Sequence, residues 1–209
     1  MIRNYLISSK GRGGQLQVAM QRLDVEGDVL QPVIDELGPL LVKKRMEVRV
    51  KTSGHGGVDC DRNLMRIAVS NLLNNAAKYG AAGTIIECRL EISDTSVEFA
   101  CFNEGSGIPV DRLDDVFGEF TRFDTSGAGG TGLGLHVVKM IAELHHGTVR
   151  AESGYIIDGQ PMTYDSFYNA DDYFERKEKE AHFKKFARFI LIIPARMKSH
   201  GESDRAEEV

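Results

Sequence analysis

The stretch TIIECRLEISDTSVEFACF, residues 84–102, decides the fold class of this chain. Residues 84–92 and 96–102 have the composition of strands, and the link between them is short. Two strands joined in this way are predicted to form an antiparallel hairpin. Such a hairpin, together with helices that do not alternate regularly with strands, disfavours a doubly wound parallel sheet.

The rest of the chain supplies three more strands and three main helices. The first helix has apolar residues at helical spacing from Val29 to Leu41 and a candidate cap at Asp28. The second runs to about Tyr79 and can be capped by Asp59 or Asp61, and the third occupies residues 131–146. A short helical piece is expected at 110–120, and the predicted strands are 47–52, 84–92, 96–102, 147–153 and 187–194. The predicted fold is a two-layer α/β sandwich, in which a mixed five-stranded sheet packs on about three helices.

Composition narrows the class of protein. The chain has 209 residues and a net charge of −5, so we do not expect a nucleic-acid partner. Its three cysteines form no CxxC pair, which favours a reducing compartment. No apolar run reaches the roughly 18–20 residues of a membrane helix, and no signal peptide is evident at the start. A cytoplasmic location is therefore expected, although the parent protein could be anchored in a membrane.

A polar stripe lies on the second helix, in NLLNNAAKYG (residues 71–80). Asn71, Asn75, Lys78 and Tyr79 fall on one helical face. Side-chain carbonyl oxygens suit Mg²⁺, and a lysine can bind phosphate. The stripe therefore predicts a metal–phosphate site, and a solvated helix face is the alternative.

Two glycine-rich turns complete the set of motifs. NEGSGIP (103–109) follows a strand, where glycines let the backbone approach a flat ligand and Asn103 can bind a nucleobase edge. GGTGLG (129–134) opens a helix, whose first-turn N–H groups favour an anion. The second motif matches neither the P-loop nor the Rossmann pattern.

Taken in order, these pieces resemble one family. NLLNNAAKYG is similar to the N box, NEGSGIP to the G1 box, VFGEFTRF to the F box and GGTGLGL to the G2 box of the ATP-binding catalytic domain of sensor histidine kinases. That domain belongs to the wider gyrase–Hsp90–MutL group of nucleotide-binding folds. The resemblance covers residues from about 29 to 153 and the last strand, to Pro194, and it implies ATP and Mg²⁺ as ligands.

The resemblance also implies roles for single residues. Asn75 would bind Mg²⁺ with Asn71 in support, while Lys78 would bind phosphate and Tyr79 would flank the nucleotide. The implied catalytic residues are Asn71, Lys78 and Arg122, the last of which would neutralise charge on the γ-phosphate. The loop from Phe117 to Thr131 would be a mobile lid. The complete implied nucleotide-binding set is Asn71, Asn75, Lys78, Tyr79, Asn103, Gly105, Gly107, Ile108, Phe117, Gly130, Thr131, Gly132, Leu133, Gly134 and Leu135.

Two positions depart from relatives of the family. The ATPase members carry a glutamate where this chain has Asn71, and an amide cannot act as a general base, so phosphoryl transfer is preferred over hydrolysis. The G1 box usually begins with aspartate, and Asn103 loses its charge assistance, which is worth about 1 kcal/mol. A degenerate nucleotide-binding scaffold and an anti-sigma-factor-type serine kinase of the same fold remain as alternatives.

The partners follow from the histidines of the chain. None of the six has the context of a phosphoacceptor histidine, so we expect the acceptor on a dimerisation domain outside this chain. A response regulator would be an indirect partner, and the chain itself would be a monomer. His145 and His146 are expected to interact with a helix dipole.

The resemblance also divides the chain. Residues 1–22 are expected to be the remnant of a preceding helical hairpin or linker, residues 23–195 the catalytic domain, and residues 196–209 a disordered polar tail. A helical insertion is predicted at about 155–186, where acids and bases alternate, with Glu175 and Lys179 one turn apart. It is either a solvated excursion or a docking surface for a partner or for the hairpin.

Overall fold

The hairpin forms as predicted in the computed structural model, which describes residues 18–119 and 132–196. Strand β4 (Ile85–Ile92) pairs antiparallel with β5 (Ser96–Gly105), and Cys88 lies opposite Cys101. Apolar residues of β4 at alternate positions are buried, while Glu87, Arg89 and Glu91 between them are exposed. The sheet therefore buries one face and leaves the other to solvent.

The main sheet has six strands in the order β2-β4-β5-β8-β6-β7. Strand β2 (Glu47–Ser53) runs parallel to β4, and all other pairs in this sheet are antiparallel. β8 (Lys184–Pro194) lies between β5 and β6 (Thr148–Ile157). The mixed sheet is confirmed, but the predicted number of strands was one too low, because β7 (Gln160–Thr163) lies in the stretch expected to be helical.

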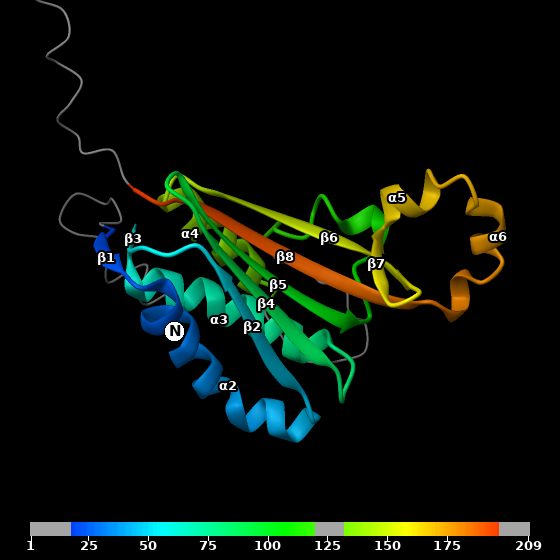
Figure 1. Cartoon of the computed structure of the whole chain (residues 1–209), viewed down its shortest axis with the longest axis horizontal. Helices are drawn as coiled ribbons and strands as arrows, with labels where there is room; N and C mark the ends of the chain where they lie inside the picture. The colour runs from blue at the N-terminus through cyan, green and yellow to red at the C-terminus, as the bar shows by residue number, and fades with distance from the viewer. Residues whose placement is uncertain (1–17, 120–131, 197–209) are drawn as a thin grey trace, which may run out of the picture.

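Three helices cover one face of this sheet, as Figure 1 shows. They are α2 (Gln31–Lys44), α3 (Arg62–Tyr79) and α4 (Gly134–Leu144). One continuous core joins them to the sheet and includes Leu72 and Leu73 from α3, Ile141 from α4 and Leu191 from β8. The two-layer α/β sandwich is therefore confirmed.

The structure decides where the first two helices, α2 and α3, begin. The sequence allowed two caps for α3 and predicted a cap for α2 that is not observed. Asp61 caps α3, because its Oδ1 accepts the backbone N–H groups of Asn63 and Leu64 at 2.9 and 3.0 Å. Before α2 the chain forms a π-helical turn, η1 (Glu26–Leu30), so helical structure starts before the expected cap at Asp28. Asp28 instead accepts the N–H of Asp24.

A second, small sheet lies beside α3. Strand β1 (Gln21–Leu23) pairs antiparallel with β3 (Val58–Cys60), and Leu23 and Val58 are both buried. Neither of these two strands was among those predicted from the sequence. Three-residue strands carry too few alternating side chains to be recognised by periodicity.

The short helical piece expected at 110–120 is mostly turn. Only η2 (Val110–Arg112) forms a single 3-10 turn, and the described residues that follow, to Glu119, are turns and bends. Val116 is nevertheless buried, so this segment packs on the core without becoming an α-helix.

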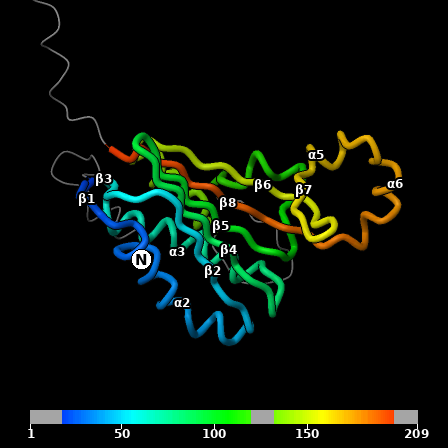
Figure 2. The backbone as a smooth tube through the Cα atoms, in the orientation of Figure 1, coloured from blue at the N-terminus to red at the C-terminus, as the bar shows by residue number. Residues whose placement is uncertain are grey.

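The predicted helical insertion is not one continuous helix. After β7 it folds into three short turns of helix, α5 (Tyr164–Tyr168), α6 (Tyr173–Lys177) and η3 (Glu180–His182). In Figures 1 and 2 this part projects from one end of the sheet. Its buried aromatic side chains, Tyr155, Tyr164 and Phe167, form a cluster of their own. Local charge pairs indicated a helix, but burial of these rings decides the path of the chain.

His145 is buried rather than facing a helix dipole as a charged partner. It is 1% exposed, and its Nε2 accepts the backbone N–H of Asp61 at 3.0 Å. Because an N–H donates to Nε2, the proton of the neutral ring lies on Nδ1, which donates to the carbonyl of Ile141 at 2.7 Å. Burial is the largest effect on this group and lowers the pKa of the imidazole, so His145 interacts with the last-turn carbonyl of α4 as a neutral donor and not as a charged group.

Candidate nucleotide-binding site

A pocket of about 400 Å³ opens where the end of α3, the turn after β5 and strand β8 meet. Small-molecule sites have volumes of roughly 300–1,000 Å³, so the pocket is large enough for a nucleotide-sized ligand. It is lined by Asn75, Lys78, Tyr79, Asn103, Ser106, Gly107, Ile108, Pro109, Val116, Leu135, Ala187 and Phe189.

Helix α3 places three polar side chains on one side of this pocket. Asn75 lies about one turn before both Lys78 and Tyr79, and all three line the pocket. Lys78 Nζ donates to the Tyr79 hydroxyl at 3.0 Å and lies 4.7 Å from the centre of that ring. The end of the helix is held by Lys44, whose Nζ donates to the Lys78 carbonyl at 2.6 Å. Three of the four residues in the predicted polar stripe therefore line the pocket, namely Asn75, Lys78 and Tyr79.

Asn103, on strand β5, lines the pocket from its buried side. The residue is 2% exposed and lies between Ile86 on β4 and Ala187 on β8. Its Nδ2 donates to the carbonyl of Glu104 at 3.4 Å, a long hydrogen bond. A buried amide at a pocket floor offers both a donor and an acceptor to the edge of a ligand.

The turn after β5 needs glycine at two positions. A Cβ on Gly105 would lie 2.2 Å from the Tyr79 carbonyl oxygen, so the turn packs directly on the end of α3. Gly107 has a φ of +65°, and a Cβ there would lie 3.1 Å from Ser153 Oγ. The glycines of NEGSGIP therefore serve close packing of the pocket wall, and Gly107 also lines the pocket.

Apolar side chains also line the pocket, namely Ile108, Val116, Leu135 and Phe189. The sequence analysis did not select Ser106, Pro109, Val116, Ala187 or Phe189. Alternation along strand 187–194 places Ala187 and Phe189 on the same face, which was the signal available for these two.

Six described residues of the predicted set do not line the pocket: Asn71, Gly105, Phe117, Gly132, Leu133 and Gly134. Asn71 Nδ2 donates to the Ile67 carbonyl at 2.9 Å, one turn back along α3. Gly105 supports the turn through its contact with α3. Phe117 packs edge-on against Phe189, with ring centres 6.3 Å apart, and so lies behind the pocket wall.

The start of α4 lies beside Asn71. A Cβ built on Gly134 would be 2.8 Å from Asn71 Oδ1, which brings the first residue of α4 against α3. Gly132 and Leu133 lead into this helix, and among the described residues no side chain caps its first turn. The N–H groups of that turn are therefore available to an anion. Arg122, Gly130 and Thr131 lie outside the described residues, as does the expected lid from residue 120 onward.

The donor set of this site fits Mg-ATP. The buried Asn103 and the apolar wall suit a flat heteroaromatic base, while Asn75, Lys78 and the start of α4 suit a phosphate chain with its metal.

Comparison with known proteins identifies the family. Residues 60–194 match the family described as "Histidine kinase-, DNA gyrase B-, and HSP90-like ATPase". The chain belongs to this family. The match includes α3, the turn after β5, the start of α4 and β8, which are the elements that build the pocket.

Within the family, the similar curated proteins are sensor kinases. Sensor protein BasS of Escherichia coli is 34% identical over 128 residues, which cover 61% of this chain and 35% of BasS. The probable sensor kinase SilS of Salmonella typhimurium is 29% identical over 164 residues, which cover 73% of this chain and 32% of SilS. The chain thus spans about a third of the length of these relatives.

Solved structures share the fold. The catalytic domain of histidine kinase ThkA, in a nucleotide-free form, has a TM-score of 0.62 and 21% identity, covering 84% of this chain and 95% of that one. The mycobacterial sensor histidine kinase MprB has a TM-score of 0.58 and 24% identity, covering 86% of this chain and 100% of that one. Within the described residues, no helix combines the length and apolar character needed to cross a membrane.

Proposed function

We propose that this chain is the catalytic domain of a two-component sensor histidine kinase, acting in the cytoplasm. It binds Mg-ATP and donates the γ-phosphoryl group to a histidine on a dimerisation domain of the parent protein. The observation that carries this proposal is the convergence of α3, the turn after β5, β8 and the start of α4 on one pocket. The family match and the sensor-kinase relatives support the same conclusion.

Each part of the site has a role in this proposal. Asn103 binds the edge of adenine, and the wall formed by Ile108, Leu135 and Phe189 excludes water from its face. Asn75 offers its side-chain oxygen to Mg²⁺, while Lys78 and the first N–H groups of α4 bind phosphate. Mg²⁺ would neutralise charge on the phosphate chain. Arg122 would do the same at the γ-phosphate.

Transfer is favoured over hydrolysis by the chemistry of Asn71. An amide nitrogen carries no basic lone pair, and here it donates to the Ile67 carbonyl. The Asn71 amide nitrogen therefore acts as a hydrogen-bond donor to the backbone and cannot accept a proton from water. Its Oδ1, which lies toward Gly134, supports the start of α4 instead.

A response regulator is the proposed downstream partner. The histidine kinase ThkA has been solved in complex with the response regulator TrrA, and this chain shares the fold of that kinase with a TM-score of 0.62 at 17% identity, covering 93% of this chain and 47% of that one. The regulator would receive the phosphoryl group from the phosphorylated histidine rather than from the pocket itself.

Titration calorimetry with ATP, in excess Mg²⁺ and again in a chelator, tests the nucleotide site. Asn75→Ala should weaken Mg-ATP binding roughly tenfold or more and remove the difference between the two conditions, because the metal ligand is lost. Asn74→Ala is the matched control, since Asn74 is exposed and bonds to Ser70 rather than lining the pocket. It should behave as wild type.

The outcomes separate the alternatives. No binding by wild type at millimolar ATP would overturn the kinase proposal. A radiolabelled transfer assay with the dimerisation domain supplied in trans then tests catalysis, and binding without any transfer would favour a nucleotide-binding scaffold.

A further inference from the structure

Ser153 connects the insertion to the wall of the pocket. It lies in β6 directly opposite Ala187 of β8, is 1% exposed, and belongs to no motif found in the sequence. Its hydroxyl accepts the backbone N–H of Ile108 at 2.9 Å and donates to the carbonyl of Phe186. One side chain therefore joins the turn after β5 to β8.

Ser153 contacts the turn after β5 at a point where the turn is closely packed. A Cβ on Gly107 would lie 3.0 Å from Lys185 Cβ and 3.1 Å from Ser153 Oγ. Gly107 and Ile108 both line the pocket. The position of Ser153 thus sets the position of the backbone on which this wall is built.

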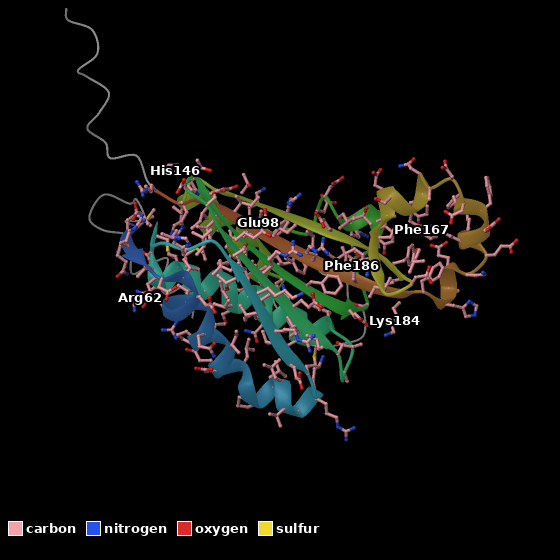
Figure 3. All side chains as sticks on the ribbon, viewed as in Figure 1. Arg62, Glu98, His146, Phe167, Lys184 and Phe186 are labelled. Carbon is pink, nitrogen blue, oxygen red and sulfur yellow. The ribbon has the colours of Figure 1, made fainter. Side chains whose placement is uncertain are left out.

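The insertion also begins beside Ser153. Tyr164, on α5, directly follows Thr163, which pairs with Gly154, the neighbour of Ser153 in β6. Tyr164 is buried and packs with Tyr155 and Phe167 in the aromatic cluster. Figure 3 shows Phe167 within the projecting part and Phe186 on β8 near its base. Burial of the Tyr164 ring raises the pKa of its hydroxyl, so the group stays protonated at neutral pH.

A second contact joins the insertion to the same segment of chain. Leu113, which follows the turn and η2, packs against both the main core and the aromatic cluster. The stretch 108–113 is therefore held at both of its ends, by Ser153 of β6 at Ile108 and by the aromatic cluster of the insertion at Leu113.

We propose that Ser153 is a positioning residue for the base-binding wall of the pocket, and that the insertion, through Tyr164, sets the affinity for the adenine part of the nucleotide. This inference rests on the proposed function. Without the hydroxyl, the Ile108 N–H loses its buried partner and the turn can relax, so that binding of the base must order it again.

The test compares ligands that share only part of ATP. Affinities of ATP, adenosine and Mg-tripolyphosphate are measured for wild type, Ser153→Ala, Tyr164→Phe and Ser166→Ala. Ser153→Ala should weaken ATP and adenosine by the same factor, roughly fivefold to tenfold, and leave tripolyphosphate unchanged. Tyr164→Phe should show the same pattern with a smaller factor. Ser166→Ala, an exposed position on the same short helix, should change none of the three.

Each failure has its own signature. A wild type that binds neither ATP nor adenosine overturns the proposed function and this inference with it. Wild-type binding of ATP together with unchanged adenosine affinity in Ser153→Ala overturns this inference alone, as does an equal loss for tripolyphosphate. If Ser153→Ala does not fold, the test uses Tyr164→Phe, which keeps the buried ring. An unchanged adenosine affinity in that folded variant overturns the inference.

Discussion

At the scale of single residues, one imidazole joins the two helices that flank the pocket. His145 follows α4, and its ring receives the N–H of Asp61, the residue that caps α3. The arrangement needs a neutral ring, because a protonated Nε2 could not accept this hydrogen bond. Burial lowers the pKa of His145, which agrees with the geometry.

This residue makes stability depend on pH. Because the pKa of His145 is lower in the folded chain, its contribution is complete above about pH 6.5 and is lost as the pH falls below that value, where the unfolded chain takes up a proton first. The slope from one such group is at most about 1.4 kcal/mol per pH unit.

Urea unfolding from about pH 5 to pH 8 measures this slope. Relative to wild type, His145→Gln should unfold with a shallower dependence on pH below about pH 6.5, because the group that takes up the proton is gone. His182→Gln removes an exposed histidine and should leave the slope unchanged. Equal slopes in wild type and His145→Gln would show that His145 is not the group responsible.

At the scale of elements, helix α3 supplies three of the polar side chains that line the pocket. Its apolar side, with Leu72, Leu73 and Ala76, is buried in the core, and this fixes the direction in which Asn75 and Lys78 face. The start of the helix depends on Asp61, whose Oδ2 also accepts the N–H of Ala19 at 2.9 Å. One buried carboxylate therefore holds both the helix and the segment that leads to β1.

Loss of this cap should destabilise the domain. Asp61→Ala removes an N-cap that typically contributes about 1–2 kcal/mol to the free energy of unfolding. Asp59→Ala, two residues away, removes only a surface ion pair with Arg22 and should cost less than about 1 kcal/mol. Chemical denaturation of both variants makes the comparison, and a cost for Asp59→Ala as large as that for Asp61→Ala would contradict the assignment of the cap.

At the scale of the whole molecule, the described residues form two separate clusters of buried side chains. The large one lies between the sheet and the three helices, and the small one lies within the insertion. Leu113 packs against both. Because the small cluster contains few side chains, the insertion should open locally at a lower free energy than the sheet.

Truncation of the small cluster should act locally. Phe167 is fully buried, and removal of a buried aromatic ring typically costs about 3–5 kcal/mol. Phe167→Ala should therefore speed amide hydrogen exchange over residues 155–183 while β4 and β5 keep their protection. Phe174→Ala, at a side chain that is 81% exposed, is the control and should leave exchange unchanged. Loss of protection spread evenly over the sheet would show that the insertion does not unfold as a separate unit.

The sequence by itself determined five of the six strands of the main sheet, its three helices, and the motif residues that line the pocket from α3, the turn after β5 and α4. These follow from local periodicity, caps and turn residues, which act over a few neighbouring positions. The pattern allowed either Asp59 or Asp61 as the cap of α3, and in the structure the cap is Asp61.

The tertiary structure decided which of these residues meet. Asn71 and Asn75 share a helical face in the sequence, yet only Asn75 lines the pocket, because the start of α4 packs beside Asn71. Ala187 and Phe189 enter the pocket from a strand far along the chain, and the rings of the insertion override its charge pattern. Contacts between distant segments depend on burial and packing of the whole core, which local sequence patterns do not encode.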